Sequence, residues 1–260
     1  MRAQIAQVSF RGTIRERSIE PYLRIFHALR TRGRVRGVLF DISSGGGEAV
    51  ASMDLYLAVK RLNQVKPVFA SIGGIGASGA YLAALGARRI FAYPESQVGS
   101  IGVIYPHLAI RELLRRLGVS VELLHVGAHK DAYQGYRPLT DEERTKLLAV
   151  AQESYDVFVA RVAEERHRPV EEIRALATGE VWSGRRAAEL GLLDALGDRE
   201  VALEELARAV GVPVGRTVRV APPRPFFERM LSRGVGSITA GVRESLEDAV
   251  LDLGGPALLR

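Results

Sequence analysis

The sequence contains no cysteine and only one tryptophan. Without thiols the chain cannot form disulfide bonds, use a cysteine nucleophile or hold a metal through thiolates. Its five histidines show no spacing typical of metal ligands. We therefore expect neither a metal site nor a cofactor.

Long apolar runs are also scarce. The N-terminal residues MRAQIAQVSFRG contain too short an apolar run for a signal peptide or a membrane anchor. One stretch, from Pro67 to Ala87, carries no charge over 21 residues, which is long enough to cross a bilayer. Its five glycines and leading proline make a poor lipid-facing helix. The expected location is therefore the cytoplasm, with no anchor in this chain.

Positive charge is in excess. The net charge is +6, the isoelectric point is about 9.8, and nine arginines lie within residues 1–40. Aromatic residues do not alternate with these arginines in a stacking pattern, and no nucleic-acid-binding motif accompanies them. We interpret the arginines as a solvated face, with contact to an anionic surface as the alternative, and expect no nucleic-acid partner.

Apolar periodicity predicts alternating strands and helices. The expected strands are residues 3–10, 35–42, 68–72, 89–93 and 120–126, with 191–194 as a short extended piece. The expected helices are residues 18–30, 48–63, 108–117, 141–166, 169–177, 183–190 and 199–210, with another after Gly79. Ser18 is the expected N-cap of the first helix, and Thr140 with Glu143 forms a capping box before the longest one. This alternation favours an α/β fold with right-handed crossovers and a parallel sheet.

We expect one domain over residues 1–215. The composition changes after Gly215, where Pro222, Pro223 and Pro225 indicate a linker. An apolar stripe at roughly helical spacing follows, so residues 216–260 are predicted to form the linker and an amphipathic tail. The tail could dock on the body or on another subunit, or make a peripheral membrane contact.

The stretch from Lys66 to Ala87, KPVFASIGGIGASGAYLAALGA, changes from a strand pattern to a helical pattern at Ser78. Glycines on both sides allow the tight turn that lifts a hydroxyl onto a helix N-terminus, which favours developing negative charge. Two other interpretations use the same residues: Gly74 to Gly79 matches the G-x-G-x-x-G dinucleotide fingerprint, and Ser78 could be a helix N-cap. The α/β-hydrolase elbow does not fit, because Ala80 stands where its last glycine belongs.

A second glycine-rich loop, SSGGG at residues 43–47, follows the strand expected at 35–42. Such a loop can direct bare backbone N–H groups at an anionic atom, either a phosphate or an oxyanion. Ligands collect at the carboxyl ends of parallel strands, and both glycine loops fall there. On its own the loop could equally be a flexible turn.

Four segments of the chain resemble one family when they are taken in order. They are SSGGG at residues 43–47, KPVFASIGGIGASGAY at 66–81, VGSIGVI at 98–104 and GAHKDAYQGYRPLTDEER at 127–144. Their order and spacing are similar to those of the signal peptide peptidase A family of serine proteases. The resemblance covers residues 4–211 and implies the fold of Clp protease and the crotonases, in which β-β-α units repeat around a mainly parallel sheet flanked by helices.

The resemblance implies a Ser-Lys dyad, with Ser78 as the nucleophile, Lys130 as the general base and Ser100 as the residue that positions the lysine amine. Family members assemble rings in which serine and lysine come from neighbouring subunits, so a homo-oligomer is implied as well. The chemistry is reasonable on physical grounds, because burial can lower a lysine pKa by up to about 3 to 5 units from its ordinary value of about 10.4. A neutral amine can then accept the serine proton.

The resemblance also implies an oxyanion hole, formed by the N–H groups of Gly45 or Gly46 together with that of Gly79. This chain departs from the family pattern in the first of these loops. The usual S-P-G-G reads S-S-G-G here, so Ser44 lacks the fixed φ of proline and the hole could be more mobile.

The leading hypothesis is an endopeptidase that hydrolyses remnant signal peptides or other extended apolar peptides through an acyl-enzyme. His107 is a rival base, since Clp proteases place a catalytic histidine at a similar distance after the serine, and Asp131 could orient it. A third hypothesis is a non-proteolytic scaffold with the same fold. The retention of Ser78, Ser100 and Lys130 together argues against the scaffold.

Overall fold

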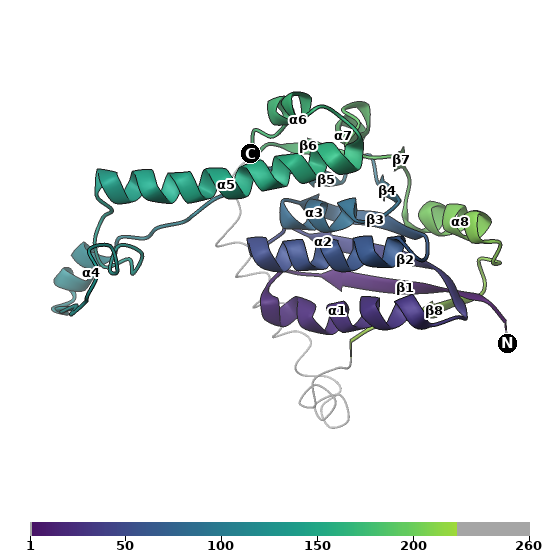
Figure 1. Cartoon of the computed structure of the whole chain (residues 1–260), viewed down its shortest axis with the longest axis horizontal. Helices are drawn as coiled ribbons and strands as arrows, with labels where there is room; N and C mark the ends of the chain where they lie inside the picture. Colours follow the sequence, from purple (N-terminus) through teal and green to yellow (C-terminus); the bar gives the residue numbers. More distant parts are fainter. Residues whose placement is uncertain (1, 223–260) are drawn as a thin grey trace, which may run out of the picture. The chain divides into compact units, whose positions relative to one another are not determined.

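The computed structural model describes residues 2–222, and in that part of the chain an eight-stranded sheet forms the centre (Figure 1). The strands are β1 Gln4–Arg11, β2 Val35–Ser44, β3 Val68–Ala77, β4 Arg89–Ala92, β5 Gln97–Gly99, β6 Val181–Ser183, β7 Ala195–Leu196 and β8 Thr217–Arg219. The helices are α1 Glu16–Thr31, α2 Ala49–Asn63, α3 Gly79–Leu85, α4 Arg111–Arg116, α5 Asp141–Arg166, α6 Val170–Leu176, α7 Gly184–Glu189 and α8 Arg199–Val210.

The main path of the sheet runs β6-β5-β3-β2-β1-β8, and β4 pairs with β3 and β7. All of these pairings are parallel except β5 with β6. The middle strand β3 changes partner along its length: residues 69–72 pair with β4, and residues 75–77 pair with β5. The predicted α/β fold with a mainly parallel sheet and flanking helices is confirmed.

Both faces of the sheet are apolar, because successive residues of a strand point to opposite faces. In β2, Val38 and Phe40 belong to the larger core that also contains residues of α1, α2 and α3. Leu39, between them, belongs to a second core with Leu206 of α8. This two-sided burial explains why residues 35–42 form a nearly continuous apolar run.

Several predicted elements differ from the observed ones. Residues 120–126, predicted as a strand, form neither strand nor helix, and Val126 in this segment is 97% exposed. Arg15, not Ser18, is the N-cap of α1; Ser18 is the third helical residue, and its hydroxyl accepts a hydrogen bond from the Arg15 N–H. Residues 191–194, predicted as an extended piece, form no strand; β7 begins immediately after them, at Ala195. The Thr140–Glu143 capping box and the length of α5 are confirmed.

Strand β8 lies beyond the boundary predicted at residue 215 and pairs with β1. The first compact unit continues to Ala221, and a second unit begins at Pro222. The predicted amphipathic tail lies outside the described residues. Within residues 2–222, no helix is long and apolar enough to cross a membrane, and no group of three or more His, Asp or Glu side chains is arranged to hold a metal.

Residues 104–149, called the arm below, contain α4 and the first turns of α5. In Figure 1, α4 lies near the end of α5 that is remote from the sheet. Within the described chain, every side-chain hydrogen bond and ion pair of the arm is made to another arm residue. The other half of α5 is anchored by buried apolar residues, among them Phe158 and Val162.

Candidate active site

Ser78 stands between the last residue of β3 and the first residue of α3. Its backbone angles, φ 52° and ψ −126°, lie in a region that side-chain-bearing residues rarely occupy. The Ser78 N–H donates to the Gly99 carbonyl at 2.7 Å, which fixes the turn. Its half-buried hydroxyl has no hydrogen-bond partner among residues 2–222. Such backbone strain is typical of functional positions, where it holds a reactive group in place.

The glycine loop after β2 packs directly on this turn. A Cβ atom added to Gly46, whose φ is +98°, would lie 2.8 Å from the Gly79 nitrogen and 2.9 Å from the Ser78 Cβ. A Cβ on Gly79 would in turn collide with the side chain of Ser52. Glycine is therefore required at both positions, because a side chain on Gly46 would push the loop away from the serine turn and one on Gly79 would push the start of α3 away from Ser52. The structure brings together the predicted residues Gly46, Ser78 and Gly79.

The backbone amides around the serine differ in availability. The Gly79 N–H is the first of α3, so it has no partner within the helix. The Gly46 N–H donates to the Ser44 hydroxyl at 3.1 Å. The Gly46 carbonyl accepts a hydrogen bond from the Ile14 N–H at 2.9 Å, so this carbonyl is directed at Ile14 and not at the serine. Gly45 is exposed on the same loop.

Ser100 follows the strand next to that of Ser78. Ala77 and Gly99 are paired across β3 and β5, so the two serines leave adjacent parallel strands at the same level. Ser100 also has a positive φ, of 50°, and its N–H donates to the Glu180 carbonyl at 2.6 Å. The structure thus places Ser100 beside the Ser78 turn.

Lys130 lies on the arm, in a run of turns between α4 and α5. It is exposed, and its backbone N–H donates to the Gly127 carbonyl at 3.1 Å. Within residues 2–222, no side-chain hydrogen bond or ion pair joins the arm to the Ser78 turn. The two members predicted for the dyad are therefore not hydrogen-bonded to each other within one copy of the protein.

His107, the rival base, lies on the arm as well. Its Nε2 atom is 2.9 Å from the Arg137 carbonyl oxygen. A carbonyl oxygen only accepts, so Nε2 carries a proton there and is not free to take another. Asp131 does not orient His107 as suggested from sequence; it is bound by Arg137, and the histidine that approaches it is His125, at 3.8 Å.

The cluster around Lys130 is dominated by Arg137, which sequence reasoning did not single out. Its guanidinium donates to both carboxylate oxygens of Asp131 and of Glu143, with distances of 2.7 to 2.9 Å. These hydrogen bonds hold the pKa of both carboxyl groups below their ordinary values and raise the pKa of Arg137. Arg137 lies in the segment RPLT, which is part of the family resemblance. That resemblance was the feature of the sequence that could have pointed to Arg137.

The dinucleotide interpretation of Gly74 to Gly79 is not supported by the structure. Residues 74–77 belong to β3, and residues 75–77 pair with β5. A phosphate-binding fingerprint needs its glycines in the turn between strand and helix, with amides free to face the ligand. Here most of the fingerprint is strand backbone.

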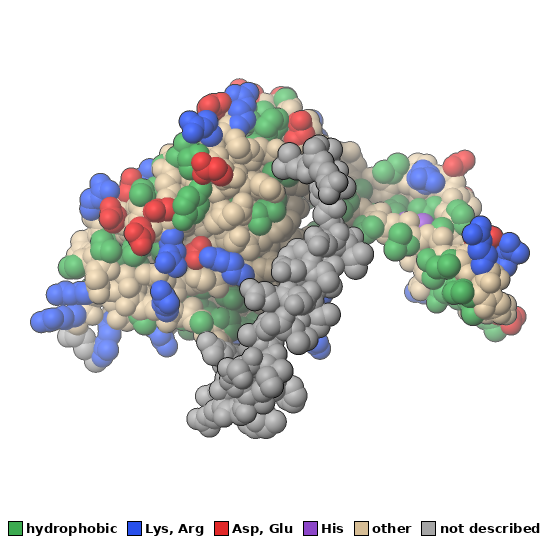
Figure 2. Space-filling model, turned by 180° about the vertical axis from the view of Figure 1, so that it is seen from behind, with side chains coloured by type: hydrophobic (Ala, Val, Ile, Leu, Met, Phe, Trp, Pro, Cys, Tyr) green, Lys and Arg blue, Asp and Glu red, His purple; other side chains and the backbone are tan. Residues whose placement is uncertain are grey.

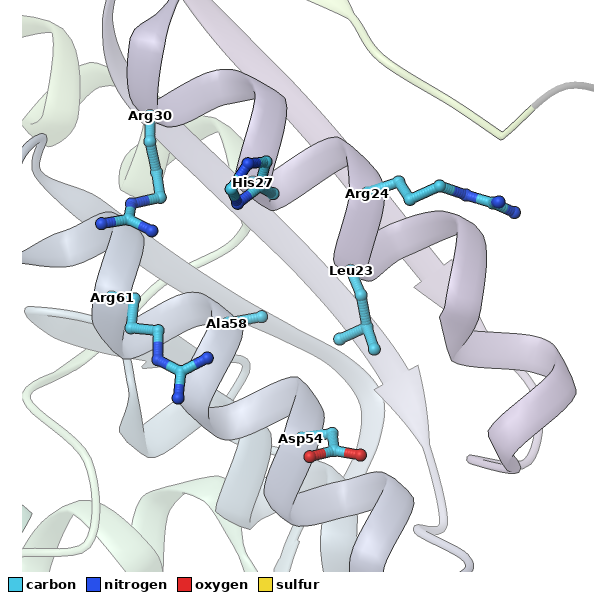
Figure 3. A pocket seen from close by; sticks show the side chains of 7 residues that line it. All are labelled: Leu23, Arg24, His27, Arg30, Asp54, Ala58 and Arg61. Atoms are coloured by element: carbon cyan, nitrogen blue, oxygen red, sulfur yellow. The ribbon is translucent and has the colours of Figure 1, made fainter.

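A separate open pocket of about 510 Å³ lies between α1 and α2. Figure 3 shows its lining: Leu23, Arg24, His27 and Arg30 from α1, and Asp54, Ala58 and Arg61 from α2. None of the predicted site residues lines it. It belongs to the basic N-terminal face and is distinct from the Ser78 turn.

Comparison with known proteins identifies the class to which this fold and serine turn belong. Residues 60–213 match the model of peptidase family S49, so the chain belongs to that family of serine proteases. The match includes Ser78, Ser100 and Lys130, and the resemblance to the signal peptide peptidase A family is confirmed.

Two relatives and one solved structure illustrate the similarity. The chain is 37% identical over 191 residues to "Putative protease MJ0651" of Methanocaldococcus jannaschii, covering 74% of this chain and 61% of the relative. It is 29% identical over 238 residues to "Serine protease SPPA, chloroplastic" of Arabidopsis thaliana, covering 90% of this chain and 35% of the relative. Both relatives are thus considerably longer than the part matched. A mutant of the "1510-N membrane-bound stomatin-specific protease" with a substrate peptide shares the fold, with a TM-score of 0.54 and 15% identity over 89% of this chain and 97% of that one.

Proposed function

We propose that this chain is a serine endopeptidase in which Ser78 is the nucleophile and Lys130 is the general base. The observation that carries the proposal is the Ser78 turn: a strained backbone, a hydroxyl free of partners within residues 2–222, and glycine backbone packed against it. A helix cap alone would not need this geometry. No side-chain cap hydrogen bond is made by Ser78 to α3, which argues against the purely structural role.

In the proposed reaction, the neutral Lys130 amine takes the hydroxyl proton as Ser78 Oγ attacks the peptide carbonyl carbon. The tetrahedral intermediate collapses when its C–N bond breaks, and the lysine returns the proton to the leaving amine. Water then repeats the sequence on the ester, so the second product is a carboxylate and Ser78 is regenerated. Ser100, beside the serine turn, is the proposed partner that holds the amine in line.

The proposed oxyanion hole combines the Gly79 N–H with an N–H from the loop at residues 45–46. Gly79 is favoured because its amide has no partner within α3 and lies at the nucleophile. Each donor of this kind is worth about 2.7 to 4 kcal/mol in the transition state. In the free chain the Gly46 N–H is bound to Ser44, so the loop offers Gly45 first, or Gly46 after the Ser44 hydroxyl rotates away.

The base is proposed to reach the serine of another copy of the chain. Two observations support this: within the described chain no side-chain hydrogen bond or ion pair joins the arm to the body, and large apolar side chains remain exposed on the arm. Figure 2 shows hydrophobic side chains spread over the arm, at the right of the view. Leu108 is 78% exposed, Leu124 91% and Val126 97%. An accumulation of exposed apolar side chains on one part of a molecule is characteristic of protein interfaces.

The substrates proposed are extended apolar peptides, such as remnant signal peptides. The proposal rests on the family, and on a physical point: a peptide that adds a strand beside the site needs only backbone hydrogen bonds and shallow side-chain pockets.

The test is in-trans complementation. Ser78→Ala and Lys130→Ala variants are each assayed with fluorescein-labelled casein and fluorogenic apolar peptides, first alone and then mixed after dissociation and reassembly. Each variant alone should lose at least about 1,000-fold in kcat. The mixture should regain activity, because some serines then face intact lysines.

Controls separate the alternatives. Lys146→Ala, a second lysine of the same arm, and His107→Ala should both remain active. Loss of activity in His107→Ala with Lys130→Ala active would transfer the role of base to the histidine. Activity in Ser78→Ala would remove the proposal, and an inactive wild-type chain would favour the scaffold hypothesis.

A further inference from the structure

The Lys130 side chain has little that could hold it in place. It is exposed, and the loop around it consists of turns closed by short-range backbone hydrogen bonds: Lys130 to Gly127, Ala132 to His129 and Gln134 to Asp131. A general base must nevertheless lie within hydrogen-bond reach of the proton that it removes. The position of this amine therefore depends on what fixes the loop.

The neighbouring residue, Asp131, provides the firmest connection. Arg137 Nε donates to Asp131 Oδ2 at 2.7 Å, and Arg137 Nη2 donates to Asp131 Oδ1 at 2.9 Å. This is the bidentate geometry that only a guanidinium offers to a carboxylate. The contact holds the backbone directly next to Lys130.

The same guanidinium grips the start of α5. Arg137 Nη1 and Nη2 donate to the two carboxylate oxygens of Glu143 at 2.8 and 2.7 Å. Glu143 is almost fully buried and also accepts from the Thr140 N–H at 2.9 Å, as part of the helix cap. The connection thus runs from Lys130 through Asp131, Arg137 and Glu143 into the first turn of α5.

The far end of α5 is secured to the body of the molecule. Lys60 of α2 forms ion pairs with Glu164 at 2.7 Å and with Glu165 at 2.6 Å. Phe158 and Val162 of α5 are buried in the main core. A loop tied to the start of this helix is therefore tied to a rigid element rather than to other loops.

We propose that Arg137 is the positioning residue for the general base: it locks the Lys130 loop onto α5, so that the amine is presented in one place. This inference rests on the proposed role of Lys130. Arg137 itself does not touch substrate. A lysine at position 137 could not replace it, because an ammonium cannot form two bidentate contacts at once.

The test compares kcat and KM for wild type, Arg137→Lys and Asp131→Asn with fluorogenic apolar peptides. Both variants should lower kcat by about 100-fold, since a misplacement of about 1 Å costs a factor of this size. KM should stay within about twofold, because substrate binding is not touched. Asp131→Asn leaves the contact between Arg137 and the buried Glu143 intact, so it remains informative if Arg137→Lys folds poorly.

Arg115→Lys is the matched control. Arg115 lies on the same arm and makes a bidentate contact with Glu112, at 2.9 and 2.8 Å, but that contact is remote in sequence from the Lys130 loop. It should keep wild-type kcat. Guanidinium chloride at low millimolar concentration should partly restore kcat in Arg137→Ala and leave Arg115→Ala unchanged.

A double-mutant cycle distinguishes this inference from the proposed function. If Arg137 acts through Lys130, Arg137→Lys should add no further loss to Lys130→Ala. A wild-type kcat in both Arg137→Lys and Asp131→Asn, with Lys130→Ala inactive, would overturn the positioning role alone. Full activity in Lys130→Ala would overturn the proposed base and this inference together. A loss that is equal with and without Lys130 would assign Arg137 a merely structural role.

Discussion

The serine and the lysine of the proposed dyad are held in place in two different ways. Ser78 belongs to the sheet: its turn is fixed by backbone hydrogen bonds and by glycine backbone packed within van der Waals distance. Lys130 belongs to the arm. The fully buried apolar side chain that lies closest to Lys130 in the sequence is the small one of Ala132. The arm is held instead by charged groups around Arg137.

This difference indicates which substitutions the Ser78 turn and the Lys130 loop can each tolerate. An atom added next to the Ser78 turn must displace the serine, because a close-packed interior has almost no free volume. The Lys130 loop depends instead on a few charged hydrogen bonds, so a change at Arg137 or Asp131 removes the contacts that tie this loop to α5. The Ser78 turn is thus held by close packing within the body, whereas the Lys130 loop is held by hydrogen bonds between charged side chains.

Replacing Gly46 with alanine should give the largest effect in the body. The new Cβ would lie 2.8 Å from the Gly79 nitrogen, at a φ of +98° that alanine rarely adopts. The serine turn must then shift, and kcat should fall by about 100-fold or more. The measurement is steady-state hydrolysis of a fluorogenic apolar peptide.

Gly74→Ala is the matched control for this change. A Cβ at Gly74 meets no atom within 4 Å, and the residue is exposed in the same glycine-rich stretch. Activity should remain near that of wild type. An active Gly46→Ala would show that close packing on Ser78 is not what positions the nucleophile.

The predictability of the two regions also differs. The Ser78 turn could be predicted because tight turns and close backbone approach demand glycine, and glycine is visible in a sequence. The strand predicted at 120–126 was wrong. An apolar pattern shows which side chains favour burial, but it does not show whether the same chain forms a sheet that buries them. The Arg137 clamp was missed since charged residues are common, and their pairing depends on loop geometry. Strand β8 is only three residues long and carried too weak a pattern.

The contact between α2 and the anchored half of α5 offers a test with an intermediate expected effect. Tyr56, fully buried on α2, donates its hydroxyl hydrogen to Glu165 of α5 and accepts a hydrogen bond from Lys60 at 3.0 Å. Burial, together with the Glu165 contact, raises the pKa of Tyr56 to about 12. Tyr56→Phe should lower the free energy of unfolding by about 1 kcal/mol at neutral pH.

The pH dependence of this difference has a defined sign. The folded pKa of Tyr56 lies above the unfolded value of about 10. The Tyr56 hydroxyl therefore contributes its full share to the free energy of unfolding below pH 10, and this share is lost as the pH rises towards 12. Denaturant titrations from pH 7 to 12 should show the gap between wild type and Tyr56→Phe closing over that interval. Tyr133→Phe, at an exposed tyrosine of the arm, is the control and should leave the free energy of unfolding at neutral pH unchanged.

The most local effect is expected at the cap of α5. The Thr140 hydroxyl accepts from the Glu143 N–H at 3.2 Å, while Glu143 is also held by Arg137. Thr140→Ala should cost about 1 kcal/mol locally, and Thr140→Ser should cost much less because it keeps the hydroxyl. Hydrogen exchange should speed up in residues 141–149 but not in β2 or β3, because among the described residues no side-chain hydrogen bond or ion pair joins the arm to the sheet. Faster exchange in the strands as well would mean that arm and body unfold as one unit, and the division of the site into a packed half and a charged half would then fail.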